Sequence, residues 1–385
     1  MRLTLSPNSS CNLLALVSMG ETNMSTHSTN DLATRADSRA NSSAIYSVAD
    51  SQMFPLVTLA VTTLNRPDYL RETIGSVLAQ DYPNLEILIS DNGSRDETPA
   101  LAQSLSDNDR RVRFRRNEKT VPQHEHFNQC IEAARGDFFI LLCDDDRINS
   151  RFVSELVAVT TRNADVNVVV PANLTIDEQG KVLQHFAEPE GEAFDGYQFV
   201  CRWLYGRPPR LFASVVTVLA RTELLRKCGG YRGLAGGRND DNLLFLQCAL
   251  TGTVGFAHRA IFNSRVHKGS YGANVTPRQI AESSRQFICH LQRDPCAMKI
   301  LGTLSVGRRK RIIAGIRYMT ALELTYHITF LRKSLWRELL SGEIPTYRWD
   351  ASFWFVVFRQ YYRDLRGILK RVAAAFITAP RSQYG

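Results

Sequence analysis

Three consecutive acids, Asp144, Asp145 and Asp146, follow directly on the apolar run "FFILLC" at residues 138–143. Adjacent carboxylates repel one another, and a carboxylate at the tip of a buried strand is costly unless it is paired or bound to a metal. Hard oxygen ligands suit Mg²⁺ or Mn²⁺, and protein sites for these cations are usually completed by substrate phosphates and water. The pattern therefore predicts a divalent cation that is bound both by these acids and by the diphosphate of a ligand. A solvated acidic turn is the plainer alternative.

A second acidic pair, Asp240 and Asp241, stands before the apolar helical run of residues 243–250. The dipole and free N–H groups of a helix N-terminus favour negative charge, so this position favours ionised carboxylates. The histidines give weaker signals. His124 and His126 are two residues apart and do not share a helix face, which argues against a metal site. His267, in "SRVHKGS", is a lone histidine, a residue that usually belongs to the surface or the core.

Strands and helices that alternate from Phe54 onward must position these acids. Residues 55–66, 85–94, 111–118 and 137–146 are expected strands, and the first, second and fourth end in polar tails, "TTLNR", "SDNGS" and "CDDD". Helical segments of 10–13 residues separate them, with Asp68 and Asp96 as expected N-caps and Gly136 closing the third helix. This alternation predicts an α/β fold with a Rossmann-like, doubly wound, mostly parallel sheet. Ligands of such sheets bind at the carboxyl ends of the strands, where all three tails fall.

Composition and charge divide the 385-residue chain into three parts. Residues 1–52 are rich in Ser, Thr and Asn and are expected to be disordered, so that Met24 could be the true start. Residues 53–276 form the expected α/β domain, and 277–385 a helical, basic C-terminal region. Of the net charge of +9, residues 301–385 carry +10 (15 Lys and Arg against 5 Asp and Glu). Basic residues interleaved with aromatic ones there indicate contact with an anionic membrane surface.

The cysteines and the lengths of the apolar runs indicate where in the cell the protein is expected. None of the eight cysteines forms a CxxC pair or stands near a histidine at zinc spacing, which fits a reducing cytoplasm. No run reaches the ~18 apolar residues of a membrane span. The expected location is therefore the cytoplasm, which includes the inner face of the membrane.

Three segments together resemble the family 2 glycosyltransferases of the GT-A fold. The first is "VTLAVTTLNRPDYLRETIGSVLAQDYPNLEILISDNGSRDET", the second "GDFFILLCDDDRI", which resembles the DxD metal motif, and the third "CGGYRGLAGGRNDDNLLFLQCALTG". Their order and spacing also agree with the family, from Leu56 to His267. The resemblance implies a metal-dependent, inverting transfer of a sugar from a nucleotide-diphosphate-sugar to an acceptor hydroxyl.

The resemblance also implies a role for each matching residue. Asp241 is the implied general base, and Asp145 the implied metal ligand. The residues implied to bind the nucleotide are Thr63, Asn65, Arg66, Asp91 and Asp144. Asp146 and His267 are implied to contact the metal together with Asp145. Leu64 stands where the family often has an aromatic residue, and Asn92 where a second acid is usual, which leaves the identity of the nucleotide open.

The expected partners are a donor, most readily a UDP-sugar, and a glycan or lipid-linked acceptor, in surface polysaccharide or glycolipid synthesis. Two other function classes stay open: another Mg²⁺-dependent nucleotide-binding enzyme, such as a nucleotidyltransferase, and a non-catalytic nucleotide-sugar-binding protein. A nucleotidyltransferase should carry a Gly-rich phosphate loop, which this sequence lacks. A nucleic-acid partner is not expected, because the first 300 residues sum to about −1.

Overall fold

The computed structural model describes residues 54–206, 216–237, 239–270 and 275–330, with side chains as far as Leu324. The segment expected to be disordered, residues 1–52 with Met24, lies outside the described residues. The aromatic and basic sequence after Phe330 also lies outside them.

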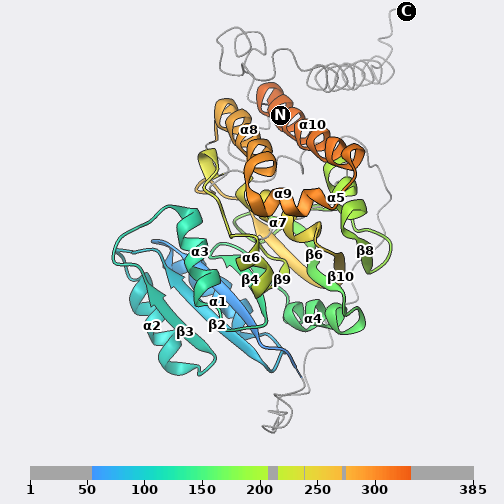
Figure 1. Ribbon diagram of the computed structural model, residues 1–385. Helices are drawn as coiled ribbons and strands as arrows, with labels where there is room; N and C mark the ends of the chain where they lie inside the picture. The colour runs from blue at the N-terminus through green and yellow to red at the C-terminus, as the bar shows by residue number, and fades with distance from the viewer. Residues whose placement is uncertain (1–53, 207–215, 238, 271–274, 331–385) are drawn as a thin grey trace, which may run out of the picture.

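The first half of the fold is a parallel α/β unit. Its four strands are arranged in the order β3-β2-β1-β4, and every neighbouring pair is parallel. The strands are β1 (Val57–Thr63), β2 (Leu85–Asp91), β3 (Val112–Arg116) and β4 (Phe138–Cys143), and the helices between them are α1 (Pro67–Leu78), α2 (Thr98–Asn108) and α3 (Gln123–Ala133). Figure 1 shows this unit with α2 and α3 beside the strands. The carboxyl ends of β1, β2 and β4 therefore share one edge, as predicted.

The second half of the sheet mixes directions. The sheet continues from β4 through β9, β6 and β10 to β5. Because β9 is antiparallel to both β4 and β6, and β6 is parallel to β10, the long strands β6 and β10 run in the direction of β4. The bounds are β5 (Arg147–Ile148), α4 (Phe152–Arg162), β6 (Val166–Ile176), β7 (Val182–His185), β8 (Ala193–Asp195), α5 (Gly196–Tyr205), β9 (Leu219–Arg221), α6 (Thr222–Lys227), α7 (Asp240–Ala249) and β10 (Thr253–Arg265). The mostly parallel sheet is confirmed, with short antiparallel strands added.

Strand β4 is apolar throughout because it is covered on both faces. Its side chains alternate between two hydrophobic clusters, with Phe139 and Leu141 in one and Phe138, Ile140 and Leu142 in the other. A strand buried on both faces reads as a continuous apolar run rather than an alternating one. The three acids therefore leave the end of a central strand.

Helix ends differ from the sequence-based expectation. Helix α1 begins at Pro67 with Arg66 as its N-cap, so Asp68 lies inside the first turn. Glu97, not Asp96, is the N-cap of α2, and α3 is capped at Ala134, two residues before Gly136. Gly136 has another role: a Cβ there would lie 2.5 Å from Thr58 N. The glycine thus permits close approach of the chain to β1.

Three helices follow the sheet and pack on its α5 and α7 side. They are α8 (Pro277–Arg293), α9 (Pro295–Gly302) and α10 (Val306–Phe330), and α10 lies along both α5 and α8. Phe287 of α8 and Ile312 of α10 belong to the same hydrophobic cluster as Phe139 of β4. The helices thus share a core with the sheet, and a domain boundary at 276/277 stays a prediction. Among the described residues, none of the helices combines the length and the apolar character needed to cross a membrane.

Candidate active site

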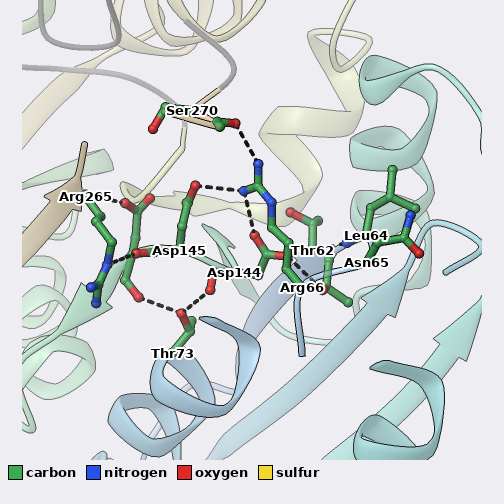
Figure 2. A network of polar contacts seen from close by, with 12 residues as sticks. Thr62, Leu64, Asn65, Arg66, Thr73, Asp144, Asp145, Arg265 and Ser270 are labelled. Carbon is green, nitrogen blue, oxygen red and sulfur yellow. Dashed lines mark hydrogen bonds and ion pairs between the residues drawn. The ribbon is translucent and has the colours of Figure 1, made fainter. Parts of the chain in front are cut away.

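The loop after β1 and the acids after β4 meet at the carboxyl edge of the sheet. Thr63 Oγ1 donates to Asp144 Oδ2 over 2.7 Å, and the Leu64 N–H approaches the same oxygen at 3.4 Å. Arg66 Nη1 lies 3.3 Å from Asp144 Oδ1 and 2.9 Å from Asp145 Oδ2, so its guanidinium bridges the two carboxylates. Figure 2 shows Arg66 reaching between them.

His267 contacts the same cluster from the loop after β10. Its Nε2 lies 2.9 Å from Asp145 Oδ2, and its Nδ1 accepts from the Gly269 N–H at 3.0 Å. Because Nδ1 is an acceptor, the ring proton is on Nε2, and His267 donates to Asp145. In this arrangement His267 orients the carboxylate. Direct binding of a cation by Nε2 would require the ring to exchange tautomers and give up the Gly269 bond.

Two residues that sequence reasoning missed, Thr73 and Arg265, fix the backbone of the acids. Thr73 Oγ1, on α1, lies 2.6 Å and 2.8 Å from the carbonyl oxygens of Asp144 and Asp146. Arg265 donates from its backbone N–H to Asp146 Oδ1 and from Nε to the Asp145 carbonyl oxygen. Arg265 is 3% exposed, and this burial of a charged side chain two positions before His267 marks the end of β10 as part of the site.

The electrostatics of the cluster fit a divalent cation. Burial, followed by the charge of Asp145, raises the pKa of Asp144 to about 6, and the same causes raise the pKa of Asp146 well above its ordinary value. Carboxylates whose charged forms are disfavoured in this way are stabilised by a nearby cation. Ligand atoms of Cys143, Asp145 and Asp146 lie within 4.8 Å of one another, the only such group of three or more in the described part of the chain.

Asp91, at the end of β2, is fully buried within a polar turn. Its carboxylate accepts from the Ser94 N–H at 3.0 Å and from Ser94 Oγ at 2.5 Å, and Arg116 Nε lies 3.1 Å away. Ser94 Oγ in turn accepts from the N–H of Asn65, a non-glycine residue with φ of +53°. The Asn65 loop and the Asp91 turn are thus connected. Ser94 links the two, and Arg116 holds the Asp91 carboxylate from the end of β3.

Asn92, where the family often has a second acid, is a structural residue here. Its Oδ1 accepts from the Val121 N–H at 3.1 Å and from Asn117 Nδ2 at 3.0 Å, while its Nδ2 donates to the Val121 carbonyl oxygen. The amide needs both a donor and an acceptor to pair with the backbone of Val121 in this way. An aspartate would offer acceptors alone.

The two acids at the start of α7 have different surroundings. Asp240 is buried and accepts from the N–H groups of Arg232 and Leu234 at 3.2 Å and 3.0 Å, which anchors the Gly-Gly-Tyr loop before the helix. Asp241 is half-buried in the first turn of α7. From the other side, Asn128 of α3 pairs with both the N–H and the carbonyl oxygen of Tyr231. Asn128 therefore holds this loop against α3.

His126 is a buried neutral histidine rather than a metal ligand. Ser90 Oγ accepts from Arg115 Nη1 at 2.7 Å and lies 2.8 Å from His126 Nε2, so the hydroxyl gives its proton to the ring. Burial, followed by the charge of Arg115, lowers the pKa of His126 from 6.5 to about 4. His124 lies elsewhere on α3, 3.9 Å from Glu125.

Replacing His126 should therefore change the pH dependence of stability. Between pH ~6.5 and ~4 the unfolded chain binds a proton at this position and the folded chain does not, so stability is lost as the pH falls through that window. The loss is up to about 3 kcal/mol. In His126→Gln, chemical unfolding at pH 7 and pH 4.5 should show a smaller decrease than in the wild type. His124→Gln is the control on the same helix, and an unchanged slope in His126→Gln would contradict this assignment.

Comparison with known proteins gives sequence and structural relatives. Residues 58–212 match the family model described as glycosyl transferase family 2. A GalNAc(5)-diNAcBac-PP-undecaprenol beta-1,3-glucosyltransferase of Campylobacter jejuni is 30% identical over 135 residues, 34% of this chain and 42% of the relative. An uncharacterised glycosyltransferase of Rickettsia typhi is 26% identical over 219 residues, 55% of this chain and 64% of the relative. The chain thus spans less than two thirds of the length of these curated relatives.

Solved structures share the fold at low sequence identity. Residues 1–349 of Staphylococcus aureus TarS, in complex with UDP-GlcNAc, superpose with a TM-score of 0.55 and 17% identity over 74% of this chain and 78% of that one. The mannosyltransferase PcManGT of Pyrobaculum calidifontis, in complex with GDP-Man and Mn²⁺, gives 0.50 and 18% over 84% and 88%. The predicted GT-A architecture is confirmed by this likeness of fold.

Proposed function

We propose that the protein transfers a sugar from a nucleotide-diphosphate-sugar to an acceptor hydroxyl, because residues 58–212 match the model of glycosyl transferase family 2. The observation that carries this proposal is the junction of the Thr63–Arg66 loop with the buried acids after β4. That junction lies at the carboxyl edge of a parallel sheet, where nucleotides bind in open α/β folds. It also combines buried acids with arginine and backbone donors suited to a charged ligand.

The donor site of this proposal consists of Thr63, Asn65, Arg66, Asp91 and Asp144. Their hydrogen bonds connect the loop after β1 with the turn after β2, which supports one continuous surface for a nucleoside. Two structural neighbours carry UDP-GlcNAc and GDP-Man. A UDP-sugar is the proposed donor here, with Asp144 beside the ribose. Asp91 is fully buried and accepts from Ser94, so its proposed role is to hold the turn that faces the uracil-type base.

Asp145 and Asp146 are the proposed ligands of Mg²⁺ or Mn²⁺, with His267 beside them and Cys143 at the rim. The cation would neutralise charge on the leaving diphosphate. Arg66 Nη1 contacts Asp145 Oδ2, and Arg66 Nη2 donates to the Gly269 carbonyl oxygen at 2.8 Å. Arg66 therefore holds the acids against the loop after β10, so that both sides of the donor site are connected by one side chain.

Asp241 is the proposed general base of an inverting single displacement. It lies in the first turn of α7, at the positive end of the helix dipole. It would accept the proton of the acceptor hydroxyl as that oxygen attacks the anomeric carbon. The bond between the sugar and the phosphate breaks, and its electron pair leaves with the diphosphate. Asp240 is less suitable, because it is buried and accepts the N–H groups of Arg232 and Leu234, whereas Asp241 is half-buried and accepts the N–H of Asn242.

Release of nucleoside diphosphate tests the reaction class. With Mn²⁺ and a panel of UDP-glucose, UDP-GlcNAc and GDP-mannose, the protein should release UDP or GDP together with a free or transferred sugar. A nucleotidyltransferase would instead release pyrophosphate from a nucleoside triphosphate. A non-catalytic nucleotide-sugar-binding protein would bind a donor and leave it intact. Either outcome would replace the proposed function.

The acceptor is proposed to be a glycan or a lipid-linked glycan at the cytoplasmic face of a membrane. The first two turns of α10 carry Arg308, Arg309, Lys310 and Arg311, all exposed, at a helix end that favours anions. Met298 and Val306, 52% and 58% exposed, precede this run in the sequence, and they are two of the four exposed large hydrophobic residues in the described ranges. Basic residues with exposed apolar neighbours fit an anionic bilayer surface.

Removal of two of these charges should weaken vesicle binding. Each basic residue near an anionic bilayer contributes about 1 kcal/mol, so Arg309→Gln with Lys310→Gln should lower partitioning onto phosphatidylglycerol vesicles about 30-fold. Co-sedimentation measures this. Arg110→Gln with Lys119→Gln removes the same charge from exposed positions on the opposite half of the sheet and should change little. Equal losses in both pairs would indicate an effect of net charge alone.

A further inference from the structure

The guanidinium of Arg66 lies between two carboxylates that the proposed function assigns to the donor and the cation. Its Nη1 is 3.3 Å from Asp144 Oδ1 and 2.9 Å from Asp145 Oδ2. The same oxygen of Asp145 lies 2.9 Å from His267 Nε2. A carboxylate oxygen has about two lone-pair sites, so these two donors use both sites of Asp145 Oδ2. A cation can bind this oxygen only in exchange for one of them.

Arg66 is the stronger competitor of a cation, because its charge is permanent. His267 accepts the Gly269 N–H through Nδ1, so its ring is neutral and acts as a donor only through Nε2. The arginine guanidinium, by contrast, stays charged in proteins. Among the described ion pairs of Asp144 and Asp145, Arg66 thus supplies the fixed positive charge. A divalent cation at the same oxygens would repel it.

The side chain of Arg66 can turn away from the acids while its backbone stays in place. The Arg66 N–H donates to Thr98 Oγ1 at 3.2 Å, and the Arg66 carbonyl oxygen accepts the N–H of Leu70 in the first turn of α1. The side chain of Arg66 is 31% exposed, whereas those of Asp144 and Asp145 are 6% and 13% exposed. The arginine is therefore the partner that can move toward solvent.

We propose that Arg66 is a built-in counter-ion of the acids after β4, which a divalent cation displaces and which then pairs with the diphosphate of the donor. This inference rests on the proposed function, in which the cation and the diphosphate share this edge of the sheet. Arginine binds phosphate oxygens through parallel N–H groups, so the displaced guanidinium exchanges carboxylates for phosphates. The cation and the donor therefore bind cooperatively, and each strengthens the binding of the other by the same factor.

Arg66→Gln tests the proposal, because it should change two affinities in opposite directions. Binding of Mn²⁺ alone, followed by electron paramagnetic resonance, should become tighter by about 10-fold or more, the factor that corresponds to one charge-assisted hydrogen bond that the cation no longer has to break. Binding of UDP at saturating Mn²⁺ should become weaker by about the same factor, because the diphosphate loses its arginine. A variant that is only misfolded would bind both ligands more weakly.

The melting temperature of Arg66→Gln gives a second readout. Without the guanidinium, the buried carboxylates are left with an uncompensated charge, so the melting temperature should fall when divalent cations are removed. Mn²⁺ should restore it, and the shift that Mn²⁺ causes should be larger in Arg66→Gln than in the wild type.

Lys268→Gln and Arg66→Lys are the controls. Lys268 is exposed in the loop that contains His267, so its replacement removes one positive charge near the acids and should change Mn²⁺ binding little. Arg66→Lys keeps the charge but replaces the planar fork by one ammonium group, so its Mn²⁺ affinity should lie between those of the wild type and Arg66→Gln.

The proposal is overturned if Arg66→Gln binds Mn²⁺ no more tightly than the wild type, or if Lys268→Gln gains as much affinity. A wild type that binds Mn²⁺ but releases no nucleoside diphosphate from any donor of the panel would instead contradict the proposed function itself.

Discussion

Asp145→Ala should lose Mn²⁺-stimulated donor turnover by a factor of at least about 100, since a metal ion contributes several kcal/mol to the stabilisation of a leaving phosphate. The change removes a proposed cation ligand. It also removes the carboxylate that Arg66 and His267 both contact, at 2.9 Å each. Mn²⁺ binding, followed by electron paramagnetic resonance, should weaken in parallel with UDP release.

Asp137→Ala is the control for that variant, because Asp137 stands at the opposite end of β4. Its carboxylate accepts from the Leu56 N–H at 3.0 Å in an exposed position, far along the strand from the acids. It should lose some stability and keep its dependence on Mn²⁺. If Asp145→Ala retained both Mn²⁺ binding and normal turnover, the acids after β4 would have no metal role.

Asp241→Asn should lose transfer by a factor of about 10²–10⁴ while it continues to bind UDP with wild-type affinity. The amide has nearly the shape of the carboxylate but cannot accept the proton of the acceptor hydroxyl. Calorimetry of UDP binding and an assay of transfer separate the two effects. Loss of UDP binding in this variant would show that Asp241 belongs to the donor site instead of acting as a base.

The neighbouring acid provides the contrast within the same helix turn. In Asp240→Asn the carboxylate that accepts from Arg232 and Leu234 is replaced, so the melting temperature should fall, by contrast with Asp241→Asn. A lower melting temperature in Asp241→Asn, without one in Asp240→Asn, would exchange the roles given to the two acids.

The edge of the sheet that carries the site was predictable because it depends on local patterns alone. Continuous apolar runs separated by helical segments of ordinary length predict parallel strands, and parallel strands bring their polar tails together. Thr63, Asn65, Asp91 and Asp144 follow from that rule, and the structure connects them through hydrogen bonds. The GT-A architecture itself was implied by the resemblance of three segments to the family 2 glycosyltransferases, and the likeness of fold confirms it.

The residues that fix the acids were not predictable, because their contacts are distant in sequence. Thr73 is an ordinary residue within the amphipathic pattern of α1, and nothing local marks it as the partner of two carbonyl oxygens beyond β4. Asn128 reads as a surface residue of α3 until its pairing with Tyr231 is known.

Helix starts were misplaced for a related reason. A good N-cap residue such as Asp68 is a local preference, whereas the start of α1 is fixed by Pro67 and by the position of Arg66. The Arg66 N–H pairs with Thr98 Oγ1, and its guanidinium pairs with two acids across the sheet edge. These tertiary contacts determine where the loop ends and the helix begins.

Thermal unfolding of the wild type with UDP-, GDP- and dTDP-sugars, each with and without Mn²⁺, tests the central claim most directly. If the acids after β4 and the Thr63–Arg66 loop form a donor site for a nucleotide-diphosphate-sugar and a divalent cation, at least one donor should raise the melting temperature, and Mn²⁺ should enlarge that shift. Asp145→Ala should abolish the part that depends on Mn²⁺. A melting temperature that no donor changes, with or without Mn²⁺, would contradict the account.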